Sequence, residues 1–234
     1  MKKILATLIG TLLAASQLHA NAQAKADERS LTGQPNSFTI EAQQYAATGY
    51  GAARLGMTIE EVKAAVSATY PGSFNNAQDV IIPVQATRAV AIVVPQVAPG
   101  PGPATITYVF GARSQRLIAV NIYWQVDGVA TAAQQESLTA GAQVLAGRLI
   151  GYQWPLFQST RGRVLGPGAL IVFAGKDAAG GGVEVRLDGV AFDVEQPGSQ
   201  GRPEDKRERR IPPPGPARLK LSIVANVDRP DVAG

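Results

Sequence analysis

The pattern of apolar and polar residues predicts a capped helix within the stretch from Gly51 to Gly72. Thr58 is followed three residues later by Glu61, which is the spacing of a capping box. In this arrangement the threonine hydroxyl accepts an N–H of the first turn, and the carboxylate reaches back to the threonine amide. We therefore expect a helix that begins at Ile59 and ends before Pro71. Its apolar stripe consists of Ile59, Val62, Ala65, Val66 and Thr69.

A second capping box predicts a longer helix. Thr131 and Gln134 have the same spacing, and an alanine-rich sequence follows from about Ala132 to Ile150. Gly151 is the residue type that commonly ends a helix. The stripe expected to be buried consists of Leu138, Ala142, Leu145 and Leu149.

Alternating and β-branched runs predict strands between and after the helices. The clearest pair is a hairpin in which residues 105–110 and 118–124 are joined by the polar turn 111–115. A last half-buried strand is expected from Leu219 to Val227. The other expected strands are 80–84, 88–94, 163–165, 169–173, 183–187 and 190–194.

The two halves of the chain show a similar succession of helix, strand, polar turn and strand. Phe110, Val120, Ile122 and Trp124 are matched 63 positions later by Phe173, Val183, Val185 and Leu187. A degenerate tandem helix-plus-hairpin repeat explains this match, although any two hairpins share so simple a pattern. The predicted fold class is α+β, with one or more antiparallel sheets packed against two capped helices.

Residues 196–217 interrupt the alternation with six prolines and a charge run. From Arg202 to Arg210, five basic residues face three acidic ones. We interpret this stretch as a solvated loop, with docking to an acidic partner or an anionic membrane surface as the alternative. The expected organisation is a signal peptide at 1–24, a flexible lead-in at 25–37, a first helix-plus-sheet unit at 38–128, a second unit at 129–195, the proline- and charge-rich loop at 196–217, and a final strand and tail at 218–234.

The first 24 residues have the three-part layout of a secretory signal peptide. Lys2 and Lys3 precede the apolar run from Ile4 to Ala15, and the small-residue pattern of a cleavage site follows as Ala20-Asn21-Ala22 or Ala22-Gln23-Ala24. An uncleaved anchor is the competing interpretation, but the run is roughly half of the ~20 apolar residues that a membrane span needs. We therefore expect a periplasmic or secreted protein with no stable membrane insertion after cleavage.

Composition excludes several classes of function. Cleavage after Ala24 leaves 20 Lys and Arg against 18 Asp and Glu, a formal charge of +2, and removes the single histidine, His19. Such a near-neutral chain with scattered aromatic residues carries no footprint for nucleic acid. A sequence without cysteine, and without histidine after residue 24, excludes thiol, zinc and Ser-His-Asp chemistry. We expect no cofactor and no metal.

Carboxylates remain as the acid-base groups. Glu184, Asp188, Asp193 and Glu195 lie close together in the sequence, and two carboxylates in different environments divide acid and base roles in hydrolases. Glu184 alternates with apolar neighbours, as on a solvent-facing strand, so ordinary surface charge is the favoured interpretation. Calcium binding by Asp177, Asp188 or Asp193 would need a loop with ligands at alternate positions, which the sequence lacks.

Three aromatic residues are the candidate binding residues. Trp124 ends a predicted strand, and Tyr152 and Trp154 follow the second predicted helix. If they line one apolar pocket or patch, they supply anchors, because aromatic side chains contribute much binding energy per residue. Core packing is the alternative that the sequence favours.

The segment from Leu55 to Thr58, followed by Glu61, Val62 and the later strands 106–110 and 117–120, resembles the small outer-membrane lipoprotein family called SmpA, OmlA or BamE. The tandem succession of helices and antiparallel strands is also similar to the β-lactamase-inhibitor-protein fold. The resemblance covers about 75 residues of the first half and implies an α+β fold. The chain departs from the lipoprotein pattern because it has no cysteine to accept a lipid, so the membrane-anchored assembly role of that family does not transfer directly.

The leading functional hypothesis is an exported, non-catalytic binding or accessory protein of the bacterial cell envelope. It would present one face of an antiparallel sheet to an envelope protein. Two alternatives stay open: a carboxylate-dependent hydrolase of a wall or sugar substrate that uses Glu184 and Asp188, and a carrier of a small apolar ligand.

Overall fold

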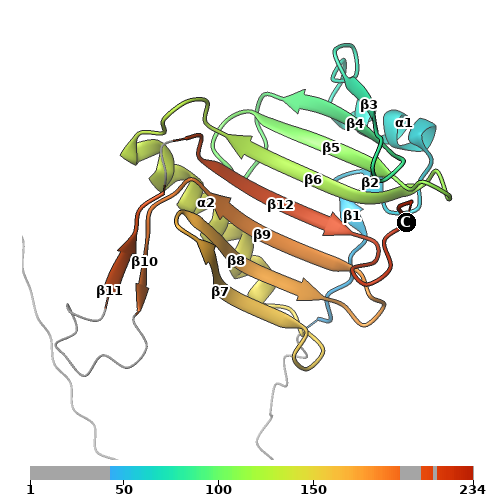
Figure 1. Ribbon diagram of the computed structural model, residues 1–234. Coiled ribbons are helices and arrows are strands. Elements are labelled where there is room, and N and C mark those ends of the chain that lie inside the picture. Colours follow the sequence, from blue (N-terminus) through green and yellow to red (C-terminus); the bar gives the residue numbers. More distant parts are fainter. Residues whose placement is uncertain (1–42, 196–206, 213–214, 234) are drawn as a thin grey trace, which may run out of the picture. The chain divides into compact units, whose positions relative to one another are not determined.

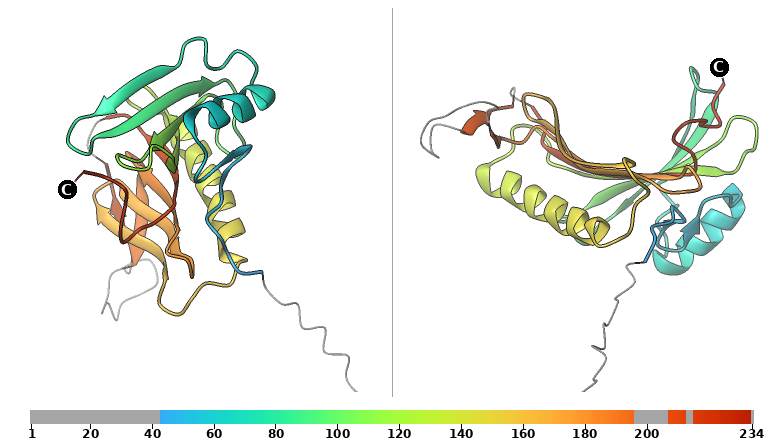
Figure 2. Two further views of the ribbon diagram at one scale, coloured as in Figure 1. Left: turned by 90° about the vertical axis from the view of Figure 1, so that its right-hand side faces the viewer. Right: turned by 90° about the horizontal axis from the view of Figure 1, so that it is seen from below.

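Two helices pack on one face of an eight-stranded antiparallel sheet, which confirms the predicted α+β fold class (Figure 1, Figure 2). This computed structural model describes residues 43–195, 207–212 and 215–233. These residues belong to one compact unit, 41–234. The predicted signal peptide, the lead-in at 25–37 and residues 196–206 of the predicted loop lie outside the described residues.

Each strand predicted from the sequence is present, with bounds shifted or extended by a few residues. The sheet contains β3 (Gln78–Ile82), β4 (Thr87–Val94), β5 (Ala104–Phe110), β6 (Leu117–Gln125), β7 (Ser159–Gly166), β8 (Ala169–Lys176), β9 (Gly182–Asp188) and β12 (Arg218–Val224). The helices are α1 (Ile59–Thr69) and α2 (Ala132–Ile150). Two small hairpins are formed by β1 (Gly49–Tyr50) with β2 (Ala53–Arg54), and by β10 (Phe192–Glu195) with β11 (Arg207–Arg210).

Both capping boxes form as the sequence predicts. The Thr58 amide donates to the Glu61 carboxylate at 2.7 Å, and the Glu61 amide donates to the Thr58 hydroxyl at 3.3 Å. At the second helix, the Thr131 amide donates to the Gln134 side-chain oxygen at 2.9 Å, and the Gln134 amide donates to the Thr131 hydroxyl at 3.3 Å. In α1 the predicted stripe is buried at Val62 and Val66 and half-buried at Ile59 and Ala65, whereas Thr69 is exposed because it lies in the last turn. In α2 the whole predicted stripe is buried, at Leu138, Ala142, Leu145 and Leu149.

The last strand of the sequence lies in the centre of the sheet. The strand order is β3-β4-β5-β6-β12-β9-β8-β7, so β12 separates two meanders. It pairs antiparallel with both neighbours, and Leu221 stands opposite Ile122 on one side and Val185 on the other. The strand predicted from Leu219 is therefore confirmed, and its central position explains why its alternate residues belong to the core.

The order of elements repeats with approximate twofold symmetry. α1 followed by β3, β4, β5 and β6 corresponds to α2 followed by β7, β8, β9 and β12. Counted from the two edges of the sheet inward, the two sets of strands have the same order, and corresponding strands run in opposite directions. A twofold axis normal to the sheet, between β6 and β12, relates strands in this way. The two sets differ in one connection. A short turn joins β5 to β6 in the first set, whereas the β10-β11 hairpin lies between β9 and β12 in the second set.

This symmetry corrects the 63-residue match between hairpins that the sequence suggested. That match places β5-β6 on β8-β9, with Val120 on Val183. The two hairpins lie on opposite sides of β12, in the order β5-β6-β12-β9-β8. The strands matched with each other, β6 with β9 and β5 with β8, run in the same direction and bury the same face of the sheet. Only a reflection relates such arrangements, and a reflection would require the opposite backbone hand. The residues look alike because both hairpins supply every second side chain to one core.

Alternate residues divide the sheet into two faces. On β6, Val120, Ile122 and Trp124 are at most 1% exposed and face the helices. Asn121 and Tyr123, between them, are half-buried and face the other way. We name the side that the helices occupy the covered face and the other side the open face. Figure 2 shows no helix or strand of the described residues lying over the open face.

Part of the predicted loop at 196–217 is a strand, so the prediction is wrong over Arg207–Arg210. β11 pairs antiparallel with β10, with Asp193 opposite Arg209 and Val194 opposite Glu208. An acidic residue opposite a basic one favours such pairing, whereas in the sequence the same charges, set between prolines, suggested a solvated loop. β10 therefore belongs to a separate hairpin rather than to the large sheet.

Candidate functional site

Trp124, the first predicted binding residue, lies in the core. Its side chain is 1% exposed, and its indole N–H donates to the Val97 carbonyl at 2.8 Å. The backbone of Gly100 passes so close that a Cβ atom there would lie 2.3 Å from the indole ring. Trp124 therefore has the core-packing role that was its alternative, and it offers almost no surface to a ligand.

Tyr152 and Trp154 lie at the covered face, and both contact the ring of Tyr45. Tyr45 stacks on Trp154 with ring centroids 4.5 Å apart and meets Tyr152 edge-on at 5.4 Å. The Trp154 indole N–H donates to the Leu149 carbonyl at 2.9 Å, which holds the cluster against the end of α2. Burial, with smaller contributions from Asp177 and Tyr152, raises the pKa of Tyr45 to about 12, so its hydroxyl stays neutral.

The two tryptophans lie at different levels of the sheet. Trp154 packs on Gly175, where a Cβ atom would lie 2.4 Å from the indole ring. The registers of β9 and β12 place Gly175 level with Val120 of β6. Trp124 is four residues further along that strand, roughly 13 Å away at ~3.3 Å per residue. The structure thus brings Tyr152 and Trp154 together and leaves Trp124 apart.

The open face carries a network of polar side chains across β6, β12 and β9. We name it the polar ladder, and it consists of Asn121, Tyr123, Glu184, Arg186, Asp188, Arg218, Lys220 and Ser222. At one end, the Asp188 carboxylate lies 2.7 Å from the Arg186 guanidinium and 3.2 Å from that of Arg218. Arg218 also lies over the ring of Tyr123, with 5.5 Å to the ring centroid. Three strands are therefore joined by one chain of polar contacts.

The other end of the polar ladder is also paired. Lys220 lies 3.5 Å from the Glu184 carboxylate, and the Ser222 hydroxyl donates to the Asn121 side-chain oxygen at 2.6 Å. The ladder contains three cations and two carboxylates, so its net charge is +1. The charged groups of the ladder are half-buried, and each has an oppositely charged partner.

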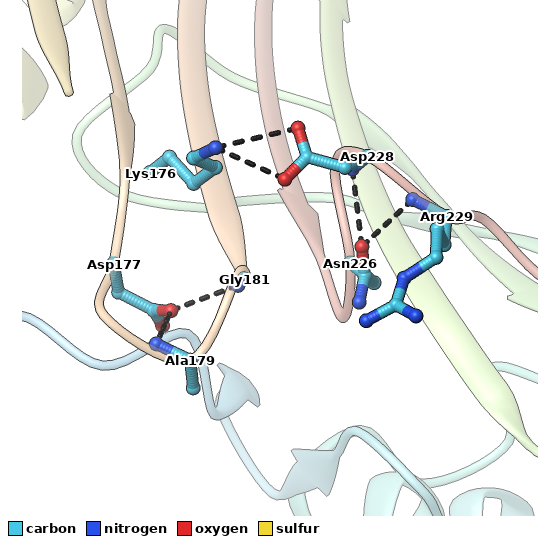
Figure 3. Close-up of polar contacts among 7 residues, drawn as sticks. All are labelled: Lys176, Asp177, Ala179, Gly181, Asn226, Asp228 and Arg229. Atoms are coloured by element: carbon cyan, nitrogen blue, oxygen red, sulfur yellow. Dashed lines mark hydrogen bonds and ion pairs between the residues drawn. The ribbon is translucent and has the colours of Figure 1, made fainter.

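A hollow of about 600 Å³ lies beside the ladder on the open face. Its floor includes Glu184, Lys220 and Ser222, and its rim includes the end of β8 and the C-terminal tail. Figure 3 shows the contact that closes this rim, in which the Lys176 ammonium lies 3.0 and 3.3 Å from the two carboxylate oxygens of Asp228. The Asn226 side chain accepts the N–H groups of Asp228 and Arg229, so the tail is fixed in a turn at this point.

Asp177 is a buried carboxylate next to this rim, and both of its oxygens accept hydrogen bonds from backbone N–H groups. One oxygen accepts the N–H groups of Ala179 at 2.9 Å and Gly181 at 2.8 Å (Figure 3). The other oxygen accepts the Ala47 N–H at 2.8 Å. Asp177 therefore ties the segment before α1 to the β8-β9 turn. Among the residues that the structure describes, no group of three or more histidine, cysteine or acidic residues is placed to hold a metal ion.

Glu184 and Asp188, the carboxylates of the hydrolase alternative, face different partners. They lie four residues apart on β9, roughly 13 Å along the strand at ~3.3 Å per residue. The carboxylates of glycosidases lie ~5 to 10 Å apart and share one substrate bond. Here Glu184 pairs with Lys220, and Asp188 pairs with two arginines. This arrangement fits charge pairing on a sheet surface better than division of acid and base roles.

The covered face contains a crevice of about 390 Å³ between α2 and the segment 43–49. Its floor consists of Val183, Leu221 and Ile223, its α2 wall of Leu145, Arg148 and Leu149, and its opposite side of Gln43, Gln44, Tyr45, Ala46, Thr48 and Gly49, with Tyr152 at the end. Tyr152 therefore lines the crevice directly. Trp154 contributes indirectly, because it supports the ring of Tyr45.

Sequence reasoning missed Tyr45 and Arg148 as site residues, and it considered Tyr123 only as the neighbour of Trp124 in one patch. Alternation along a strand places Tyr123 on the face opposite Trp124. Tyr45 gave no comparable signal, since its proximity to Tyr152 depends on contacts between distant segments. Arg148 is close to Tyr152 in the sequence, but its place opposite the segment 43–49 depends on such contacts as well. The polar ladder depends in the same way on the position of β12 between β6 and β9.

The fold and these surfaces define an α+β protein in which two helices cover one face of an eight-stranded sheet. Comparisons with protein-family models, with curated proteins and with solved structures find no match. The resemblance of the first half to the lipoproteins and to the β-lactamase-inhibitor-protein fold therefore stays a prediction. Neither α1 nor α2, the helices of the described residues, is long and apolar enough to span a membrane.

Proposed function

We propose that this chain is an exported, non-catalytic binding protein of the cell envelope that receives a protein partner on the open face of its sheet. The observation that carries the proposal is the asymmetry of the sheet. Both helices lie on one face, and over the described residues the other face has no helix or strand above it (Figure 2). The layout of residues 1–24 and the lack of cysteine support export to the periplasm.

The polar ladder supports a partner with a polar, mildly acidic surface. Its charges already have partners, so a bound protein has to fit among them without leaving any charge buried and unpaired. The net charge of +1 favours carboxylates on the partner, because complementary potentials guide association and select orientation. Tyr123 adds an aromatic ring with a polar end, which is a side chain enriched in protein interfaces.

The proposal is tested by photo-crosslinking in cells that make the protein. A photoreactive phenylalanine derivative replaces Tyr123 on the open face or, as a matched control, Ala133 on the exposed surface of α2. We expect a crosslinked product of discrete size from position 123 and none of that size from position 133. Adding Lys220→Ala should lower the yield at position 123, since it removes one cation of the ladder.

Two results would contradict this function. One is the absence of any product from position 123 although the variant is folded and exported. The other is the same set of products from positions 123 and 133, which would indicate collision rather than binding. Circular dichroism of each purified variant shows that the fold is retained.

A further inference from the structure

The crevice on the covered face follows from the width of the sheet. Eight strands at ~4.8 Å spacing span about 34 Å, whereas a helix with its side chains covers ~10 Å. Two helices therefore leave the centre of the face to other segments. Here β1 contacts both β6 and β12, and Figure 2 shows the stretch before α1 on the side of the sheet that the helices occupy. This thin segment fills the gap incompletely, and the crevice against α2 remains.

We propose that this crevice binds a single small amphiphile, with its apolar tail on the floor of Leu221 and Ile223 and its carboxylate head at Arg148. The ligand class is a medium-chain fatty acid or another acyl carboxylate of similar size. This site is separate from the proposed protein interface, because it lies on the opposite face of the sheet.

The floor and wall of the crevice suit an apolar tail. Leu145, Leu149, Leu221 and Ile223 are core residues, yet each keeps 5 to 8% of its surface exposed, unlike the fully enclosed side chains around Trp124. Their remaining exposure faces the crevice that they line. Covering apolar surface of this kind is favourable, because it removes that surface from water. The volume of about 390 Å³ is at the lower end of the ~300 to 1,000 Å³ typical of ligand pockets, which fits one chain.

The charge of the lining selects the head group. Arg148 is the single cation among the described residues that line the crevice, and none of these residues is acidic. The positive charge of Arg148 also acts on a half-buried neighbour: burial raises the pKa of Tyr50, and Arg148 partly opposes this rise. Tyr45 and Tyr152 add hydroxyl groups on the same lining. A lining that holds a guanidinium and hydroxyl donors, with no carboxylate, is complementary to a carboxylate ligand.

The test is isothermal titration of the purified full chain with decanoate, below the concentration at which decanoate forms micelles. Decanol, which has the same tail and no charge, measures the contribution of the head. Arg148→Ala removes the cation, and Arg161→Ala on the exposed edge strand is its charge-matched control. Ala46→Phe narrows the crevice from its exposed side, and Ala133→Phe on the surface of α2 is the size-matched control.

We expect saturable binding of one decanoate per chain. Arg148→Ala should weaken decanoate binding about tenfold, the loss of one charge-assisted contact, and change decanol binding by less than about twofold. Ala46→Phe should weaken both ligands about tenfold or more, while both control variants leave them unchanged. Because a cation in the last turn also stabilises a helix, the melting temperature of Arg148→Ala is measured separately from its affinity.

Three results would overturn the proposal. The first is no saturable heat with decanoate up to its micelle concentration. The second is an equal loss in Arg161→Ala and Arg148→Ala, which would show general attraction between charges. The third comes from vesicles of phosphatidylglycerol: flotation of the wild type with the vesicles, abolished by Arg148→Ala, would assign Arg148 to a membrane surface rather than to a single chain.

Discussion

The two faces of the central strands differ more than the two halves of the molecule do. On β6 and β12, one set of alternate residues, including Trp124 and Leu219, is enclosed under the helices. The intervening residues, including Tyr123 and Arg218, form the polar ladder of the open face. The same backbone thus carries the core on one side and a surface for recognition on the other. The comparison indicates that changes on the covered face should affect folding, and changes on the open face should affect binding.

The largest effect is expected from neighbouring residues that face opposite ways. Trp124→Ala removes a side chain that is 1% exposed and its hydrogen bond to Val97, so it should lower the free energy of unfolding by about 3 to 5 kcal/mol. Tyr123→Ala removes a half-buried ring and its contact with Arg218, and should cost below about 1.5 kcal/mol. Urea unfolding followed by circular dichroism measures both.

A Trp124→Phe variant keeps one aromatic ring but loses the indole N–H and part of the buried ring volume, and its loss of stability should fall between those of the two alanine variants. Equal losses in Trp124→Ala and Tyr123→Ala would refute the division into a folding face and a recognition face. If Trp124→Ala does not fold, the comparison is made with Trp124→Phe and Tyr123→Phe, which keep most of each ring.

Local signals in the sequence were sufficient to predict the individual helices and strands. Thr58 with Glu61, and Thr131 with Gln134, specify helix starts through contacts within one turn, and both starts are confirmed. The alternation of residues 105–110 and 118–124 likewise predicted a hairpin whose two strands are neighbours in the chain. Such predictions succeed because the interactions that determine them are close in sequence.

The arrangement of the elements depended on distant pairings that no local pattern encodes. Leu221 belongs to an alternating apolar and polar pattern that any strand can have, but only the assembled sheet places β12 between β6 and β9. The same insertion assembles the polar ladder from three separate strands. Trp124 and Trp154 look equivalent in the sequence, yet one is enclosed beside Gly100 and the other lies on Gly175, near the edge of the sheet. The 63-residue match failed for this reason, since similar hairpins occupy mirror-related positions.

A smaller effect is expected within the open face itself. Ser222 is 8% exposed, and its hydroxyl donates to Asn121 at 2.6 Å, so Ser222→Ala leaves a polar oxygen without that donor. The expected loss is about 1 kcal/mol in the free energy of unfolding, measured in urea. Ser222→Thr keeps the hydroxyl and should lose less than half of that. A loss above about 3 kcal/mol in Ser222→Ala would mean that the open face contributes to folding as strongly as the core.

The smallest effect concerns the C-terminal tail, which borders the hollow of the open face. The Asp231 carboxylate accepts the N–H groups of Arg113 at 3.1 Å and Ser114 at 2.8 Å. Hydrogen bonds from Ser114 and Arg113 lower the pKa of Asp231 below its ordinary 3.8. A carboxylate with a lowered pKa stabilises the docked tail above pH 3.8, and this contribution is lost as the pH falls through the lower, folded value.

The amide chemical shifts of Arg113 and Ser114, followed by NMR from pH 6 downward, should therefore titrate with a midpoint below 3.8. Asp231→Asn should abolish this titration. The site-specific measurement is needed because the pKa values of Asp79 and Glu61 are also lowered, by hydrogen bonds from Arg88 and Thr58 respectively, so global stability mixes all three. The indole N–H resonance of Trp124, which reports its bond to Val97, should stay unchanged while the tail is released, since the tail bonds to Ala112 and Gln85 instead. Simultaneous loss of both signals would show that the two faces unfold as one unit and would remove the distinction between them.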